Sequence, residues 1–371
     1  MPYEIGDTEP PHIDVHNELN AEVAELSTRS GIPVVLPPIV SLGDQGHVSD
    51  HNLYTTAIQK IADGLTPGPA IVASHTGGNV TSGVTISGKT YDIYTFTEAM
   101  TPATLQLTDE ARKNITDKEI IAAVESGASL DELLEKYGDV LRDSVEVIPA
   151  SDPGLSMTFQ QPGFVDIIAV GGGGGTFPQS GGAGAGALLQ VLQAYAPEVC
   201  SITVGAGASG GPFGAGGDGY ASNFGQYYAP GGGGPYDRVP VQSQGGSGAG
   251  GSYGGVPGTS GIPGLGNDGG AGASTTGGGG GGGASQPGQD GSGSTGGNGG
   301  DGQDISAFLV WTQGMAVVAG GGGGFNGGNG GAGGGGTNNR PGADNTGGGA
   351  GAGSQAIPGG PGLVIVRVQV A

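Results

Sequence analysis

The sequence predicts a mainly β fold with glycine-rich polyglycine II-type helices, together with short N-terminal helices and an inserted helical hairpin. The first observation is composition: 88 of the 371 residues are glycine, of which 14 lie in residues 1–170 and 74 in residues 171–371. Collagen would need glycine at every third position, and the uninterrupted run 277–283 breaks that period. The second observation is that short apolar segments frame the glycine runs. The most regular is residues 363–370, where valine alternates with other residues as in a strand.

Residues 1–65 are expected to form an N-terminal helical segment that mediates oligomerisation. They contain a weak repeat in which Gly-Asp and two histidines precede an apolar period typical of a helix. Asp14 and Asp50 stand where a carboxylate would cap the first helical turn. A proline-rich apolar stretch separates the two copies. Because two helices this short bury little by themselves, we expect them to pack on other copies of the chain in a homotrimer.

Two further segments precede the glycine-rich part of the chain. Residues 66–107 are rich in Thr, Val, Ile and Tyr, with glycines at turns, which predicts strands that begin the C-terminal domain or act as a connector. Residues 108–142 carry two capping-box patterns, one of them Thr116 with Glu119, and end each apolar period at a glycine. This second segment is therefore predicted to be a helical hairpin inserted into a β domain.

Residues 143–371 are expected to form one glycine-rich domain of strands and polyglycine II-type helices. Composition alone permits a flexible spacer as well, since Gly/Ser segments cannot offset their backbone entropy by side-chain burial. Two features favour order. Only 11 of the 201 residues in 171–371 are charged, and the glycine runs begin directly at strand ends, as at Val170 and Ala319. Tracts without side chains can pack closely and pair their N–H and C=O groups with those of neighbours.

Charge and residue content exclude several classes of function. Eleven basic residues against 33 acidic residues give a net charge of −22, so we expect no nucleic-acid partner. No apolar run reaches the ~20 residues that span a bilayer, and the N-terminus lacks the pattern of a signal peptide. The single cysteine, Cys200, excludes an internal disulfide and is expected to be a buried strand residue. No catalytic Ser/His/acid set and no lysine after a glycine-rich loop is present, so the sequence predicts neither an enzyme nor a cofactor.

Two groups of residues are candidates for binding. Four of the five histidines form i, i+4 pairs in the N-terminal repeat, where they would either hold a metal ion or cap and pack their helices; the second interpretation is favoured and no metal is assigned. Aromatic residues in the glycine-rich loops would either stack on sugars of a cell envelope or plug the ends of the glycine tracts. The metal candidates are His12, His16, His47 and His51, and the receptor-contact candidates are Tyr220, Tyr227, Tyr228 and Tyr236.

Short motifs at both ends of the chain resemble one known group of proteins. Residues 43–52 read Gly-Asp-Gln-Gly-His-Val-Ser-Asp-His-Asn. Residues 165–175 read Val-Asp-Ile-Ile-Ala-Val followed by five glycines, and residues 359–366 read Gly-Gly-Pro-Gly-Leu-Val-Ile-Val. The first motif resembles the start of many minor tail proteins of phages that infect Actinobacteria. The other two resemble the glycine-rich domain common in those proteins.

This resemblance implies a virion structural protein, namely a minor tail protein at the tail tip that contributes to host-surface adhesion. Its partners would be further copies of itself in a homotrimer, other phage tail proteins attached through residues 1–65, and a receptor in the host cell envelope. A bacterial cell-envelope protein with a glycine-repeat body is the alternative, because repeat-rich glycine sequences resemble one another by composition alone. The helical insertion at residues 108–142 departs from the pattern of the tail proteins.

Overall fold

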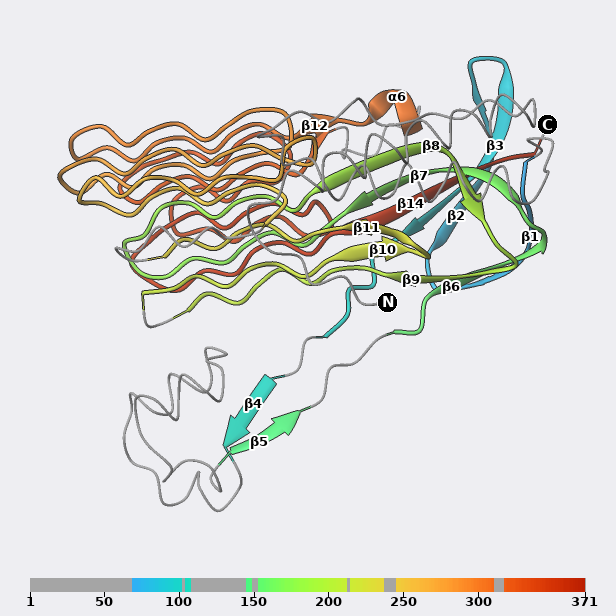
Figure 1. Ribbon diagram of the computed structural model, residues 1–371, viewed down its shortest axis with the longest axis horizontal. Helices are drawn as coiled ribbons and strands as arrows, with labels where there is room; N and C mark the ends of the chain where they lie inside the picture. The colour runs from blue at the N-terminus through green and yellow to red at the C-terminus, as the bar shows by residue number, and fades with distance from the viewer. Residues whose placement is uncertain are drawn as a thin grey trace, which may run out of the picture.

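The computed structural model places two β-sheets face to face and continues their strands into a body of glycine-rich tracts (Figure 1). The structure describes residues 69–101, 104–107, 145–148, 153–211, 214–236, 245–309 and 317–370. The N-terminal segment 1–65 and the inserted segment 108–142, which the sequence predicts to be helical, lie outside the described residues.

Sheet one has five antiparallel strands, and the last strand of the chain lies at its centre. β14 pairs with β3 on one side and with β7 on the other, so strands from three distant parts of the sequence meet. In order across the sheet the strands are β2 (Asn79–Ile86), β3 (Lys89–Phe96), β14 (Leu363–Gln369), β7 (Gly163–Val170) and β8 (Leu188–Ala196).

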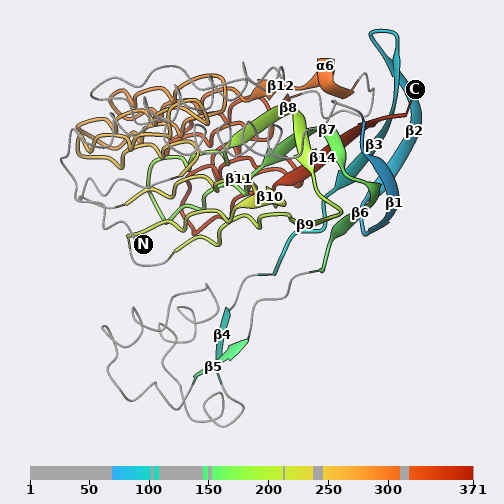
Figure 2. The same cartoon turned by 45° about the vertical axis from the view of Figure 1, so that its right-hand side comes forward.

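Sheet two also has five antiparallel strands and packs on one face of sheet one (Figure 2). In order, its strands are β1 (Ile71–Thr76), β6 (Ser156–Gln161), β9 (Val199–Thr203), β10 (Ser222–Phe224) and β11 (Tyr227–Ala229). Two antiparallel ribbons complete the strands, β4 (Thr104–Leu107) with β5 (Val145–Ile148) and β12 (Gln303–Asp304) with β13 (Val317–Val318).

The core of this sandwich forms because alternate residues of each strand point to the same side of a sheet. In β14, Val364, Val366 and Val368 point into the space between the sheets, where they join fully buried rings such as Phe96 and Phe159. Burying a side chain of this size stabilises the fold by roughly 1.5–3 kcal/mol. The core also contains Cys200, which confirms that the cysteine is a buried strand residue.

The second face of sheet one is covered as well, which explains why β14 is buried on both sides. Leu363 and Ile365 of β14 pack against Phe308 and Leu309 of the short helix α6 (Ser306–Leu309). A strand buried on both faces is usually a continuous apolar run, and β14 reads Leu-Val-Ile-Val-Arg-Val-Gln. Its one charged residue, Arg367, has a partner described below.

The glycine runs form an ordered body that we call the glycine lattice. Its tracts extend from the strand ends of the sandwich and run back and forth beside one another (Figure 1). They have neither helical nor ladder hydrogen bonds, and their amides donate to the carbonyls of other tracts. The tracts are residues 171–175, 181–187, 204–211, 216–221, 230–235, 245–252, 256–261, 266–273, 277–283, 288–291, 296–302, 319–324, 347–353 and 357–362.

The hydrogen bonds of a lattice tract repeat every third residue. In tract 181–187, successive amides donate to three neighbouring tracts in turn, over N···O distances of 2.8 to 3.1 Å. A repeat of three residues is the period of an extended threefold backbone. The carbonyls of the same tract accept from three further tracts, 171–175, 245–252 and 319–324, so six tracts surround it. The six donor–acceptor pairs are Gly182 to Gly279, Ala183 to Ala350, Gly184 to Gly233, Ala185 to Gly282, Gly186 to Gly347 and Ala187 to Pro230.

Only glycine, with occasional alanine, fits at most of these positions. A Cβ built on Gly322 would overlap the carbonyl oxygen of Ala350, and one on Gly281 would overlap that of Ala183. At both positions the space that a side chain would need is occupied by the backbone of a neighbouring tract, which cannot move aside as a flexible side chain could. The lattice is thus ordered, as the framing of the glycine runs predicts, and the flexible-spacer alternative does not describe these tracts.

The fold class expected from the sequence needs correction in its helices. That class combined a mainly β fold with polyglycine II-type helices, short N-terminal helices and an inserted helical hairpin. The structure is an assembly of antiparallel sheets and extended tracts, and α6, four residues long, is the only helix within the described ranges. The reason is that capping patterns and short apolar periods indicate where helices could begin, whereas the residues that the structure describes bury their side chains in sheets.

Candidate functional site

The tyrosines proposed as receptor contacts differ sharply in exposure. Tyr228 is 47% exposed and Tyr220 is 39% exposed, whereas Tyr227 is 1% exposed and Tyr236 is half-buried. The prediction that Tyr227 contacts a receptor is therefore wrong, because this tyrosine is a core residue whose ring is not exposed. Its hydroxyl accepts a hydrogen bond from the backbone N–H of Tyr195 in sheet one at 2.8 Å.

The hairpin of β10 and β11 explains this difference, because side chains alternate between the two faces of a strand. Tyr227 lies opposite Phe224 in the register, and both point into the sandwich core. Tyr228 lies opposite Asn223 and points outward with it. Tyr236 makes an isolated backbone bridge with Ala215 at a lattice turn. Of the four tyrosines, Tyr228 is the one on a regular outer sheet surface.

The outer surface of sheet two carries small hydroxyl side chains in regular rows. Three rows cross the strands: the first joins β1, β6 and β9, the second joins the same three strands, and the third joins β9, β10 and β11. We call these nine residues the hydroxyl face. By row, they are Thr76, Ser156 and Ser201; Ser74, Thr158 and Val199; and Thr203, Asn223 and Tyr228.

The hydroxyl face contains no charged residue, although the chain carries a net charge of −22. Its amide Asn223 is held in place because its Oδ1 accepts the backbone N–H of Thr203 at 3.0 Å. Of these nine residues, the sequence pattern indicated only Tyr228 as a binding residue. The signal was present in the alternation of residues 199–203, where Val, Ser and Thr alternate with the buried Cys200 and Ile202.

Sheet one contains a part-buried ion pair. Arg367 of β14 and Asp166 of β7 are register partners, and Nη2 of the arginine lies 2.6 Å from Oδ2 of the aspartate. The guanidinium lies over the rings of Tyr91 and Phe308, 4.7 and 4.2 Å from their centroids. Its Nη1 also donates to the carbonyl oxygen of Phe308 at 3.1 Å. This arginine thereby ties α6 to sheet one.

A polar cavity of about 220 Å³ opens beside this ion pair. Lys89, Gln193 and Gln369 also line it. The second oxygen of the Asp166 carboxylate accepts the backbone N–H of Gln193 at 2.9 Å. Because both carboxylate oxygens and the guanidinium have partners within the protein, this ion pair ties β7, β8, β14 and α6 together.

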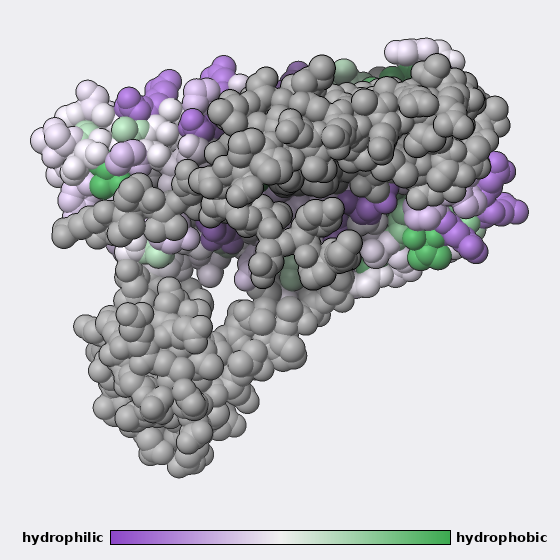
Figure 3. Space-filling model, viewed as in Figure 1, coloured by the Kyte–Doolittle hydropathy of each residue, from purple (hydrophilic) through white to green (hydrophobic). Residues whose placement is uncertain are grey.

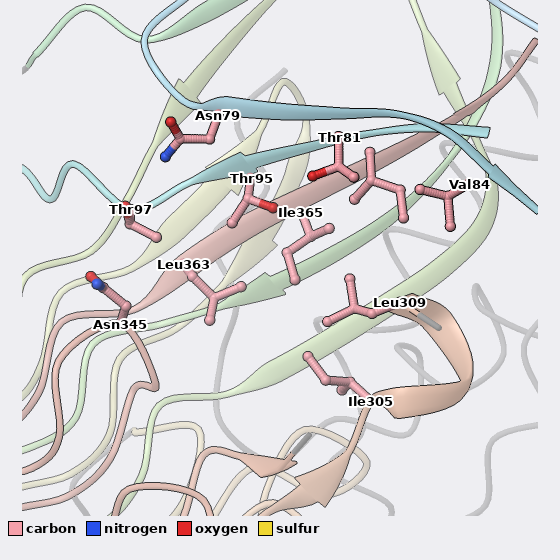
Figure 4. Close-up of a pocket in the computed structure, with 11 residues that line it drawn as sticks. Asn79, Thr81, Val84, Thr95, Thr97, Ile305, Leu309, Asn345, Leu363 and Ile365 are labelled. Carbon is pink, nitrogen blue, oxygen red and sulfur yellow. The ribbon is translucent and has the colours of Figure 1, made fainter. Parts of the chain in front are cut away.

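A second cavity, of about 260 Å³, lies between sheet one and α6 (Figure 4). Its walls are aliphatic and hydroxyl side chains such as Ile365, Leu309 and Thr95, with Asn79 and Asn345 at one end. None of its lining residues is titratable. Mixed aliphatic and hydroxyl walls of this kind can hold an uncharged group.

The histidines proposed as metal ligands, His12, His16, His47 and His51, lie outside the part of the chain that the structure describes. Within the described residues, no three His, Cys, Asp or Glu side chains are grouped so that they could hold a metal ion. His75 packs edge-on against the ring of Tyr94, with 5.3 Å between centroids. Burial raises the pKa of the Cys200 thiol to about 12, so this cysteine is not a nucleophile at neutral pH. In the described ranges, no helix has the length and apolar character to cross a bilayer.

Comparison with known families agrees with the lattice and the strands that frame it. The model of a glycine-rich domain matches residues 152–369. The chain belongs to this glycine-rich domain family. The match covers β6 to β14 and the whole lattice, whereas β1 to β3, which complete both sheets, precede it. No curated protein matches the chain. The glycine-rich domain defines an architecture and assigns no chemistry to it.

Proposed function

We propose that this protein is a structural protein of a phage virion, a minor tail protein at the tail tip that contributes to contact with the host surface. The observation that carries the proposal is the glycine lattice, together with the resemblance of residues 43–52 and 165–175 to motifs of tail proteins. A body whose interior tracts are hydrogen-bonded to neighbouring tracts all around them is stiff without needing a large side-chain core. A stiff body suits a part that transmits force at the end of a particle.

The far end of the lattice supports a role in contact. Its turns are tied to one another: Phe325 donates its N–H to the carbonyl of Ser180 at 3.2 Å, and Gln179 donates to that of Gly353 at 2.7 Å. The side chains at these turns are short and uncharged for the most part. In Figure 3 the corresponding left end of the molecule is mainly white and purple. Exposed residues of this kind include Ser274, Thr275, Ser292, Ser294, Asn326, Asn339 and Ser354.

Location in the particle tests this proposal directly. Antibody-labelled electron micrographs of purified virions should place the protein at the tail tip, and mass spectrometry should detect it in washed particles. Its absence from virions would contradict the proposal. If the protein were instead recovered from the envelope fraction of uninfected bacteria, the alternative of a cell-envelope glycine-repeat protein would replace it.

The proposal includes assembly into a homotrimer, with other tail proteins as further partners. Residues 1–65 support the trimer, because their apolar periods are too short to form a core in one chain. Light scattering of the purified full-length chain should give three times the mass of 35.7 kDa. A monomer at micromolar concentration would contradict the trimer and leave the tail location to be judged by microscopy.

A further inference from the structure

We propose that the hydroxyl face of sheet two binds an uncharged polysaccharide and that the ring of Tyr228 is its main contact. This inference names the partner class for the proposed contact with a host surface, and to that extent it rests on the proposed function. It depends on the chemistry, the exposure and the rigidity of the nine residues that form the face.

The chemistry of the face matches that of a neutral sugar. Six of its nine side chains are serine or threonine hydroxyls, one is an amide and one is a phenol. A hydroxyl both donates and accepts hydrogen bonds, so it can pair with a sugar hydroxyl in either sense. The face has no charge with which to bind an acidic glycan, and a chain of net charge −22 repels one.

Two exposed apolar groups lie among these hydroxyls. Tyr228 is 47% exposed at one end of the third row, and Val199 is 61% exposed in the second row. A tyrosine ring offers a large contact area at a low entropy cost and also carries a hydroxyl. A protein interface of ordinary size has an apolar core with several aromatic residues, whereas this face has one aromatic ring in a polar surround. The composition therefore favours a sugar over a protein partner.

The face is held rigidly from below. Its strands lie about 4.8 Å apart, and the two cavities described above are lined by residues outside it. Beneath Tyr228, the hairpin is fixed by Phe224, which is fully buried, and by the bond from Tyr195 to the Tyr227 hydroxyl. A preorganised surface loses little entropy on binding. A row of hydroxyls that crosses three strands suits an extended polymer that lies along it.

The test uses the purified full-length chain and affinity electrophoresis in gels that contain dextran, amylose, mannan or galactan, with polygalacturonate as the acidic control. We expect retardation by at least one of the neutral polymers and none by polygalacturonate. The variant Tyr228→Ala should weaken that binding by about tenfold or more. Ser201→Glu, which places a negative charge in the first row, should weaken it without touching the ring.

Tyr253→Ala is the matched control, because Tyr253 is 40% exposed at a lattice turn, outside the face. It should bind as the unchanged chain does. The inference is overturned if none of the four neutral polymers retards the protein, or if Tyr253→Ala loses as much affinity as Tyr228→Ala. Failure of the inference and of the proposed function are distinguishable. A tail-tip protein without polysaccharide binding refutes the inference alone, whereas binding through Tyr228 by a protein absent from virions refutes the tail location alone.

Discussion

The sandwich and the glycine lattice are continuous in the chain but are held together by different forces. In the sandwich, large side chains such as Phe96, Phe159 and Ile167 are fully buried between two sheets. In the lattice, most residues have no side chain, and order depends on amides that donate to the carbonyls of neighbouring tracts. Hydrophobic burial therefore stabilises one region of the chain and backbone hydrogen bonding the other. The boundary between them lies at defined residues, for example between Val170 and Gly171.

The difference indicates which region depends on the other. Ordering a backbone costs about 1–2 kcal/mol per residue, and a net hydrogen bond returns about 1 kcal/mol, with smaller gains from Cα–H···O contacts. For a lattice of glycine alone, the entropy cost of ordering the backbone and the gain from hydrogen bonds are thus nearly equal. The strand ends of β7, β8, β9, β11 and β14 fix where its first tracts begin. We expect the lattice to need the sandwich, and the sandwich to survive damage to the lattice.

The largest effect is expected from Phe159→Ala in the sandwich. Removing a buried phenylalanine costs about 3–5 kcal/mol, and this ring is 1% exposed in the core between the sheets. Loss of the sandwich should also release the lattice. Alkylation of Cys200 reports on the sandwich, because its buried thiol, with a pKa of about 12, reacts only when the sheets separate. Faster alkylation together with faster amide exchange in tract 181–187 is the expected result. A lattice that kept its protection while Cys200 reacted would show the dependence to be wrong.

A smaller and more local effect is expected from Gly322→Val in the lattice. Its side chain would overlap the backbone of Ala350, so tract 319–324 must move away from its neighbours. Amide exchange should rise in that tract and in tract 347–353, while Cys200 stays unreactive to alkylation.

Gly293→Asn is the matched control for the lattice. Gly293 has φ of +58° and nothing within 4 Å of an added Cβ. Asparagine adopts this region readily, and Asn345 already has φ of 57°. Exchange in both tracts should stay unchanged. Equal damage from Gly293→Asn and Gly322→Val would contradict close backbone packing as the reason for glycine.

The smallest effect is expected from Asp166→Asn, which removes the charge opposite Arg367 but keeps an oxygen that can accept a hydrogen bond. Since the pair is part-buried, we expect a loss of about 1–3 kcal/mol in the free energy of unfolding, measured by urea denaturation. Loosening should appear first at Phe308, whose carbonyl binds the same guanidinium. Unchanged stability would show that the two aromatic rings and the Phe308 carbonyl hold the arginine without the aspartate charge.

The sequence predicted the regular features of the molecule and missed those that depend on distant partners. The alternation in residues 363–370 indicated a strand, and the structure has one, β14, with both faces buried. The glycine runs indicated close backbone packing, which the hydrogen bonds confirm. The sequence could not show which tract lies beside which, because residues without side chains carry no pattern that distinguishes one glycine neighbour from another.

The candidate site shows the same limit at the level of single residues. Tyr227 and Tyr228 are neighbours of the same type, and composition treats them alike. One is buried and the other exposed because the register of β10 with β11 sets Tyr227 opposite Phe224 and Tyr228 opposite Asn223. The rows of the hydroxyl face likewise arise from the pairing of β1, β6 and β9, which are far apart in the sequence.

The central claim is that backbone hydrogen bonds between tracts hold the lattice in one ordered arrangement. Hydrogen exchange followed by mass spectrometry on the full-length chain at neutral pH tests it most directly. We predict that amides of tracts 171–175, 181–187, 277–283 and 319–324 exchange at least about a thousandfold more slowly than in an unstructured chain, an opening free energy of about 4 kcal/mol. Exchange of these amides at the rate of an unstructured chain, with β7 and β14 still protected, would contradict the claim.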